Sequence, residues 1–313
     1  MGRYLVKRVL RSFVTLFIVC TIVFCLLRFM PIEGYFNNFD KMTPAQVNRQ
    51  LQAKGLKDPM HVQLKRFYAN LARGDLGMSN RYKPGLPITT ILKDRIPVSM
   101  GLGIVALALA LLLAIPFGRV MANHKSGIPD HLGTIFIVVI NAVPAVVYYL
   151  FIQMYFTQIF GLPVLFRRGN VLSYLLPIIS LALGNIAYYA MWIRRYMIDE
   201  SNKDYVKLAI AKGCKSKDVM RKQIFRNAFV PLIQYIPTSF ILTMVGSIYV
   251  ESLYSIPGMG GLLVKCIQSQ DNTIVQALVL IYSAFSIVGL ILGDILMTLI
   301  DPRISFSKKG GSR

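Results

Sequence analysis

Acidic residues, and charged residues in general, are scarce in this sequence. The 313-residue chain has 14 Asp and Glu against 35 Lys and Arg, and charged residues make up 16% of it. A soluble domain carries about 25% charged residues, whereas here the charges gather in a few segments between long uncharged runs. This distribution excludes an ordinary globular enzyme and a disordered chain. The net charge of +21 would suit nucleic acid, but a single Trp and the uncharged runs argue against such a surface.

Residues that support covalent chemistry are few and scattered. The four cysteines form no C-x-x-C pair, which argues against a disulfide framework and a zinc knuckle. His61, His124 and His131 stand apart, and we expect them in loops. The sequence lacks H-E-x-x-H, G-x-S-x-G and the P-loop pattern G-x-x-x-x-G-K-[ST]. We therefore expect no catalytic residue, no metal site and no cofactor in this chain.

The sequence is instead dominated by six long runs without a charged residue. They cover 12–27, 96–118, 132–166, 169–193, 227–250 and 272–293. A helix needs about 20 apolar residues to cross the hydrocarbon core, so each run accounts for one span. We expect the third run to hold a single helix near 132–159, followed by a short loop. The sequence thus predicts an all-α polytopic membrane protein with six transmembrane helices and both termini on one side.

The orientation follows from Lys and Arg in the short loops. The N-terminal residues, the 119–131 loop, the 194–226 loop with its ten basic residues and the C-terminal tail are all basic. Basic loops stay in the cytoplasm, so we expect both termini there and the 31–95 segment outside. The first apolar run is too long for a cleaved signal peptide.

Two carboxylates lie close to span ends. Glu251 closes the fifth span and Asp294 lies in the last turns of the sixth. A charge costs little near the interface, so we interpret both as solvated or capped helix ends rather than ion-binding groups. An ion-coupled carrier is therefore disfavoured, and energy is expected to enter through the largest cytoplasmic loop.

That loop has the pattern of two short helices around a glycine. Asp204 and Ser216 are predicted helix caps, and Gly213 is a natural stop because glycine tolerates the left-handed conformation. The first helix places a common face toward a partner protein. This face consists of Tyr205, Leu208, Ala209 and Lys212. The alternative is a solvated basic loop attracted to anionic lipid.

Other patterns concern the outer segment and the spans. Apolar residues at helical spacing predict an amphipathic helix between about Asp58 and Ala72, which lies on the membrane or a partner, or else packs on the chain's own spans. Proline kinks occur in spans two to five, and nearby polar groups are candidates to line a pathway, with interhelical hydrogen bonds as the alternative. These candidates are Asn141, Asn185 and Gln234.

A glycine-rich connection follows span five. Pro257, Gly258 and Gly260 offer tight turns with left-handed backbone. Glu251, one turn earlier, is a candidate to hold this connection as an outer gate. Gly289-x-x-x-Gly293 in span six is interpreted as a site of close helix packing.

At this point the sequence resembles the B-type integral membrane permease of the oligopeptide/dipeptide (peptide/nickel) ABC importers. The segment from Ala209 to Pro231 is similar to the family's coupling motif, although Lys207 and Leu208 depart from the general Glu-Ala-Ala pattern. The candidate coupling residues are Tyr205, Ala209, Ala211, Lys212, Gly213, Arg226, Asn227 and Pro231. The resemblance extends to four further stretches: Gly55-Leu56-x-Asp58-Pro59, Arg73-Gly74-Asp75-Leu76-Gly77-x-Ser79, the segment 250–260, and Asp294 with Asp301-Pro302-Arg303-Ile304.

The resemblance implies a type I ABC importer permease fold and a larger machine in a bacterial cell membrane. A homologous second permease would complete a heterodimer, and two ATP-binding subunits would bind ATP and Mg. An extracellular binding protein would deliver a peptide substrate. The implied regions are 1–30 (N-terminus and first span), 31–95 (extracellular segment), 96–304 (five-helix core with coupling loop 194–228) and 305–313 (basic tail). The alternatives are an importer of nickel or another small solute, an exporter-like channel and a structural membrane subunit.

Overall fold

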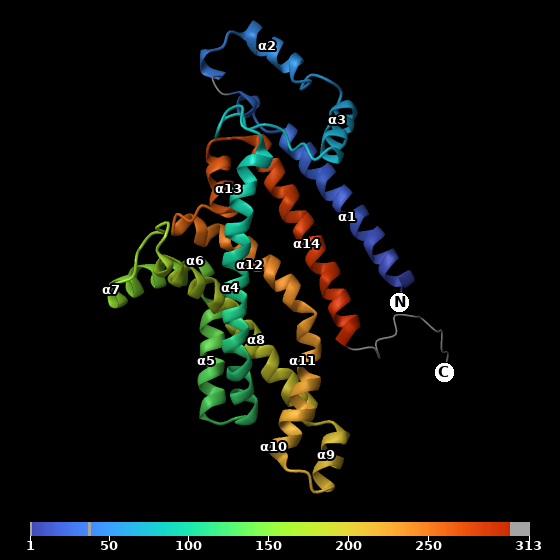
Figure 1. Cartoon of the computed structure of the whole chain (residues 1–313), viewed down its shortest axis with the longest axis vertical. Helices are drawn as coiled ribbons and strands as arrows, with labels where there is room; N and C mark the ends of the chain where they lie inside the picture. Colours follow the sequence, from blue (N-terminus) through green and yellow to red (C-terminus); the bar gives the residue numbers. More distant parts are fainter. Residues whose placement is uncertain (1, 37–38, 301–313) are drawn as a thin grey trace. The chain divides into compact units, whose positions relative to one another are not determined.

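The computed structural model describes residues 2–36 and 39–300 (Figure 1). Over these residues every continuous secondary-structure element is a helix, and the β-structure consists of an isolated bridge between Met78 and Pro87. The predicted C-terminal signature 301–304 and basic tail 305–313 lie outside the described residues. The all-α fold class is confirmed.

The chain divides into two compact units. Among the described residues, the large unit comprises 2–5, 100–256 and 288–300, and the small unit comprises 6–36, 39–99 and 257–287. The predicted division into linear regions, with a boundary at residue 95, remains a prediction.

Five helices of the described chain are long and apolar enough to cross a membrane, and a bent helix pair brings the number to six if it counts as one span. The second span is longer than its uncharged run, because α4 (Ile88–Asn123) takes in charged residues at both ends. Residues 88–95 of the predicted outer segment therefore belong to this helix. The remaining continuous span helices are α1 (Gly2–Arg28), α8 (Leu175–Ser201), α12 (Tyr235–Leu253) and α14 (Asn272–Ile300).

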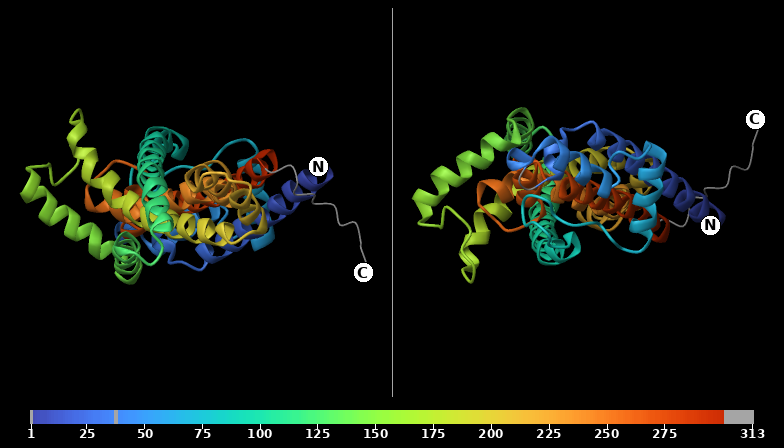
Figure 2. Two further views of the ribbon diagram at one scale, coloured as in Figure 1. Left: turned by 90° about the horizontal axis from the view of Figure 1, so that it is seen from below. Right: turned by 90° about the horizontal axis from the view of Figure 1, so that it is seen from above.

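The third span is broken, and the prediction of one helix near 132–159 is wrong. Helix α5 (Ile128–Ala142) ends before Pro144, and the chain turns by 107° into α6 (Ala145–Phe151). In Figure 2, α5 is seen end-on while α6 runs across the view. Proline lacks the N–H that would continue the helix and disfavours helical backbone before it, which explains the position of the break. A π-helical turn (Ile152–Phe156) and α7 (Thr157–Phe160) follow.

The large unit is held together by a core around α8. Ala187, Tyr189, Ala190 and Ile193 of this helix are at most 1% exposed. They pack with side chains from α4, α5 and the segment 206–232, so the polar end of the unit shares one core with the spans. That segment contains α9 (Asp204–Ala211), α10 (Ser216–Val219), a π-helical turn (Met220–Ile224) and α11 (Phe225–Ile233).

The small unit contains the amphipathic helix that the apolar spacing predicts. Helix α3 (Met60–Ala72) packs on α1: the rings of Phe67 and Phe24 lie 5.0 Å apart, and those of Tyr68 and Phe17 lie 4.8 Å apart. Of the two alternatives, packing on the chain's own spans is therefore the one observed. The unit also holds α2 (Pro44–Ala53), which a Thr43–Gln46 capping box starts, and α13 (Met259–Gln268). Two histidines expected in loops, His61 and His131, lie in helices instead.

Candidate coupling and gating sites

The predicted coupling segment forms a helical hairpin, α9–α10. Gly213 separates the two helices with φ +84°, as expected for a left-handed helix stop. The predicted caps are one residue too late, because Lys203 and Lys215 occupy the N-cap positions of α9 and α10. Asp204 instead lies in the first turn of α9, where the helix dipole favours an acidic side chain.

A hydrogen-bonded cluster ties the base of the hairpin to the spans. The Tyr205 hydroxyl donates to Glu200 Oε1 at 2.9 Å. The Asn227 amide donates to Glu200 Oε1 at 3.3 Å and to the Tyr205 oxygen at 3.2 Å. Burial raises the pKa of the Tyr205 phenol, so it remains a donor at neutral pH. The structure thus brings together two predicted coupling residues and adds Glu200, which no sequence pattern indicated.

The predicted common face of α9 is divided between the unit's core and its surface. Tyr205 and Ala209 are half-buried and pack against the core of the large unit, and Val206 between them is 4% exposed. Leu208 and Ile210 are 56% and 52% exposed. Ala211, Lys212, Arg226 and Asn227 are also exposed. The hairpin therefore presents an apolar pair bordered by lysines, with Ala209 turned toward its own chain.

The polar candidates for a pathway have different surroundings. Asn185 donates to Thr243 Oγ1 at 2.9 Å and so links α8 to α12, which favours the alternative of an interhelical hydrogen bond. Asn141 is exposed, next to the break after α5. Gln234 lies at the junction of α11 and α12, where a Cβ added to Gly293 would lie 2.6 Å from its backbone oxygen. This contact agrees with close packing at the Gly289-x-x-x-Gly293 pattern. Lining of a pathway by these residues remains a prediction.

The carboxylates at the span ends are not solvated. Glu251 is fully buried, and its Oε1 accepts a hydrogen bond from Ser247 at 2.8 Å. Asp294 is 7% exposed. Burial contradicts the solvated alternative for both carboxylates, and the alternative of a capped carboxylate stays a prediction.

The backbone of the predicted gate also differs from expectation. The left-handed residue in this connection is Ser255, with φ 56°, while Gly258 has φ −102° and precedes α13 as its N-cap. Gly260 lies in the first turn of α13, and Pro257 is exposed. The role of Glu251, Pro257, Gly258 and Gly260 in gating remains a prediction.

An ion pair that the sequence did not indicate joins α5 to α8. The Arg194 guanidinium donates to both carboxylate oxygens of Asp130, with 2.7 Å between Nη2 and Oδ2. Asp130 is 3% exposed and also accepts the Ser126 N–H at 2.9 Å. An acid in the first turn of a helix is a recognisable signal, but nothing in the sequence identifies its partner 64 residues away.

A second carboxylate missed by sequence reasoning organises the small unit. Asp271 is fully buried, and its Oδ2 accepts the Ser79 hydroxyl at 2.7 Å. The same oxygen accepts the backbone N–H groups of Asn80, Arg81 and Tyr82 at 2.9–3.0 Å. Its other oxygen accepts the N–H of Ile274 at 3.4 Å, which places Asp271 at the start of α14. An aspartate before a long apolar run is a helix-start signal, but its contact with 79–82 depends on the fold.

These features define a polytopic membrane component whose large unit carries a polar helical hairpin, α9–α10, packed on its own core. The chain belongs to the family of binding-protein-dependent transport system inner membrane components, whose model matches residues 114–306. The N-terminal model for such membrane components matches residues 1–103.

Two relatives are permease proteins that this chain matches over nearly their whole length. The chain is 30% identical over 304 residues to the dipeptide transport system permease protein DppB of Lactococcus lactis, covering 97% of this chain and 99% of the relative. It is 29% identical over 309 residues to the oligopeptide transport system permease protein OppB of Haemophilus influenzae, covering 98% and 100%. The resemblance to B-type permeases is thereby confirmed.

The fold also resembles solved importer structures. An inward-facing structure of the MetNI methionine ABC transporter matches 68% of this chain and 97% of that chain, with a TM-score of 0.54 and 14% identity. As a member of the family described above, the protein is a multi-pass inner membrane permease component and not itself an enzyme. Membership of a binding-protein-dependent system implies a binding protein and ATPase partners.

Proposed function

We propose that this chain forms half of the translocation pathway of a peptide importer. A homologous second permease completes the pathway, an extracellular binding protein delivers a dipeptide or oligopeptide, and two cytoplasmic subunits hydrolyse ATP with Mg. The names of the relatives support a peptide substrate. In this proposal both termini and the α9–α10 hairpin lie in the cytoplasm, and the 31–95 segment lies outside.

The observation that supports coupling most directly is the exposed apolar pair on the hairpin. Leu208 and Ile210 keep more than half of their surface exposed, although the adjoining Val206 and Ala209 pack inward. Burying apolar surface in a partner stabilises a complex by about 25 cal/mol per Å², so this pair is suited to a groove. Lys207, Lys212 and neighbouring lysines suit an acidic rim around that groove.

The hairpin is also built to transmit movement. The cluster of Tyr205, Glu200 and Asn227 joins it to α8 and α11 by hydrogen bonds. Val219 and Ile224, each 2% exposed, anchor its second arm in the same core as α8. A displacement of the ATPase surface would therefore move these helices with the hairpin instead of bending it.

Two substitutions test the exposed surface of the hairpin and its backbone turn independently. Leu208→Glu places a charge in the proposed groove and should abolish copurification of the ATPase subunits. Gly213→Val should misplace α10, because a β-branched residue at φ +84° costs about 1–2 kcal/mol. An added Cβ at Gly213 has no neighbour within 4 Å, so this cost is purely conformational.

Matched controls make the test specific. Lys215→Ala also changes the net charge by one unit, at an exposed N-cap, and should leave assembly intact. Gly213→Asn should retain function because asparagine tolerates the left-handed region. The readouts are copurification of the second permease and the ATPases, together with competition for uptake by dipeptides, longer peptides and nickel. Normal assembly of Leu208→Glu and Gly213→Val would refute the coupling role, and uptake that no peptide inhibits would refute the substrate class.

A further inference from the structure

The end of α12 is shaped as a Schellman motif that leaves two carbonyls over. Ser255 takes the left-handed position that stops the helix, with φ 56°, and the Ile256 N–H donates back to the Glu251 oxygen at 2.8 Å. The last carbonyls of a helix have no partner within it, and the motif does not provide for those of Leu253 and Tyr254. Donors for these two oxygens have to come from another part of the large unit.

The segment that follows the break in the third span supplies both donors. The Gln153 amide nitrogen donates to the backbone oxygens of Leu253 and Val164, both at 3.1 Å. The Phe166 N–H donates to the Tyr254 oxygen at 2.8 Å. Tyr254 is fully buried, and a buried acceptor that loses its donor carries the full cost of its desolvation. The end of α12 therefore depends on Gln153 and its neighbours for its hydrogen bonds.

A π-helical turn directs the Gln153 side chain inward. Gln153 is the polar residue of this turn and is 8% exposed, whereas Met154 and Tyr155 beside it are 59% and 52% exposed. Lipid offers no partner to an amide, so the inward direction satisfies the polar group and leaves the apolar groups outside. Such turns are rare and occur frequently at functional sites. The local backbone is thus adapted to bring this amide to α12.

We propose that Gln153 is a positioning residue for transport, an inference that rests on the proposed function. It joins the arm, defined as residues 145–166, to the end of α12, so that the two move as one body. A movement of the arm then shifts the last turn of α12, which carries Glu251, without breaking the hydrogen bonds between them. Because the chain bends by 107° before α6, α5 need not follow this movement.

Gln153→Met tests this role, since methionine has about the length of glutamine and lacks its amide. Hydrogen exchange of the assembled importer in nanodiscs should become at least tenfold faster at the N–H groups of Phe166 and Ile256. Uptake of dialanine and tetraalanine should fall several-fold while ATP hydrolysis and copurification of the ATPase subunits persist. The number of peptides imported per ATP should therefore fall, which a mere loss of folded protein would not cause.

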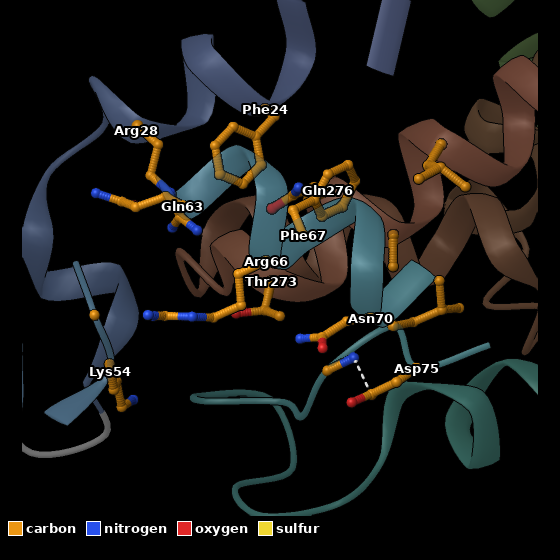
Figure 3. Close-up of a pocket in the computed structure, with 15 residues that line it drawn as sticks. Phe24, Arg28, Lys54, Gln63, Arg66, Phe67, Asn70, Asp75, Thr273 and Gln276 are labelled. Atoms are coloured by element: carbon orange, nitrogen blue, oxygen red, sulfur yellow. Dashed lines mark hydrogen bonds between the residues drawn. The ribbon is translucent and has the colours of Figure 1, made fainter. Parts of the chain in front are cut away.

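Gln63 offers a matched control in the small unit. Its amide nitrogen also donates to two backbone oxygens, those of Leu56 and Asp58 at 3.0 and 2.8 Å, and the residue is likewise 8% exposed. Figure 3 shows it beside a cavity of about 190 Å³, which leaves room for methionine. Gln63→Met should leave exchange at Phe166 and Ile256, and the peptides imported per ATP, as in the wild type.

A covalent tether tests whether the arm and the end of α12 move together, even if Gln153→Met fails to fold. In a chain without its four native cysteines, Leu165→Cys and Ser255→Cys place thiols at exposed residues. Both lie next to the residues of the hydrogen bond between Phe166 and Tyr254. Joining the two thiols with a short bismaleimide should leave uptake within about twofold of the unlinked variant, because the tether fixes a contact that already persists.

Three results would overturn the proposal. They are loss of uptake on linking, equal exchange at Phe166 in the Gln153 and Gln63 variants, and faster exchange in Gln153→Met with unchanged import per ATP. A wild type that imports neither peptide would refute the proposed function instead. The exchange measurement requires no transport, so it would still decide whether Gln153 joins the two segments.

Discussion

Replacing Asp271 tests whether one carboxylate organises the small unit. Its Oδ2 accepts four hydrogen bonds from the segment 79–82, and its side chain is fully buried. Asp271→Asn can keep an oxygen at this position but removes its charge. Hydrogen bonds to charged groups contribute about 1.5–3 kcal/mol and neutral ones about 1 kcal/mol. Since four bonds to one oxygen are not additive, we expect Asn to cost about 2 kcal/mol. Asp271→Ala, which leaves four donors without an acceptor, should cost about 4 kcal/mol.

Hydrogen exchange measures this cost at the affected amides. A loss of about 2 kcal/mol of local stability accelerates exchange about 30-fold, because 1.4 kcal/mol corresponds to a factor of ten. The N–H groups of Asn80, Arg81 and Tyr82 should show this acceleration in Asp271→Asn, and a larger one in Asp271→Ala. Asp75→Asn is the matched control, since its exposed carboxylate accepts the N–H of Gly77 within a local turn. Unchanged exchange at 80–82 in both Asp271 variants would refute the reasoning.

Three further predictions concern other parts of the chain. Arg194→Met should lower the stability of the large unit by about 3 kcal/mol, since it leaves the buried Asp130 carboxylate without its partner; a melting temperature in detergent equal to the wild type's would contradict this. Glu251→Gln should reduce peptide uptake while the ATPases stay attached. Uptake equal to the wild type's would show that Glu251 has no role in gating. Cys214, which is exposed, should react with maleimide at pH 7 while Cys266 does not, because burial and then Asp271 raise the pKa of the Cys266 thiol to about 12. Comparable labelling of the two would show that α13 opens.

The spans and the amphipathic helix were predictable because their signals are local. Uncharged runs of sufficient length locate the helices, and the apolar spacing of residues 60–71 locates α3, although only the structure shows that this helix packs on α1. The break at Pro144 was only partly predictable. A proline indicates a kink or an end, but the 107° turn depends on how α6 packs within the unit.

The errors share a physical cause. Glu251 and Asp294 were placed by their depth along a single helix, and depth does not report what neighbouring helices cover. The caps Lys203 and Lys215 differ from the expected residues by one position, since neither helix start uses a side-chain hydrogen bond. The partners of Asp130 and Asp271 lie far away in sequence. A local sequence pattern therefore identifies each acid as a residue at a helix start but does not reveal what it binds.

The contact between Ser79 and Asp271 also determines when, during translation, the small unit can form. The two residues are 192 positions apart, which at 5–20 residues per second means about 10–40 s of translation. During this interval the segment 79–82 has left the ribosome without its acceptor, and water must satisfy its N–H groups. The contact that holds 79–82 in the small unit can therefore form only after residue 271, which directly precedes the last span, has been synthesised. A chain truncated before residue 271 would lack the acceptor of the segment 79–82, so this part of the small unit would stay open to hydrogen exchange.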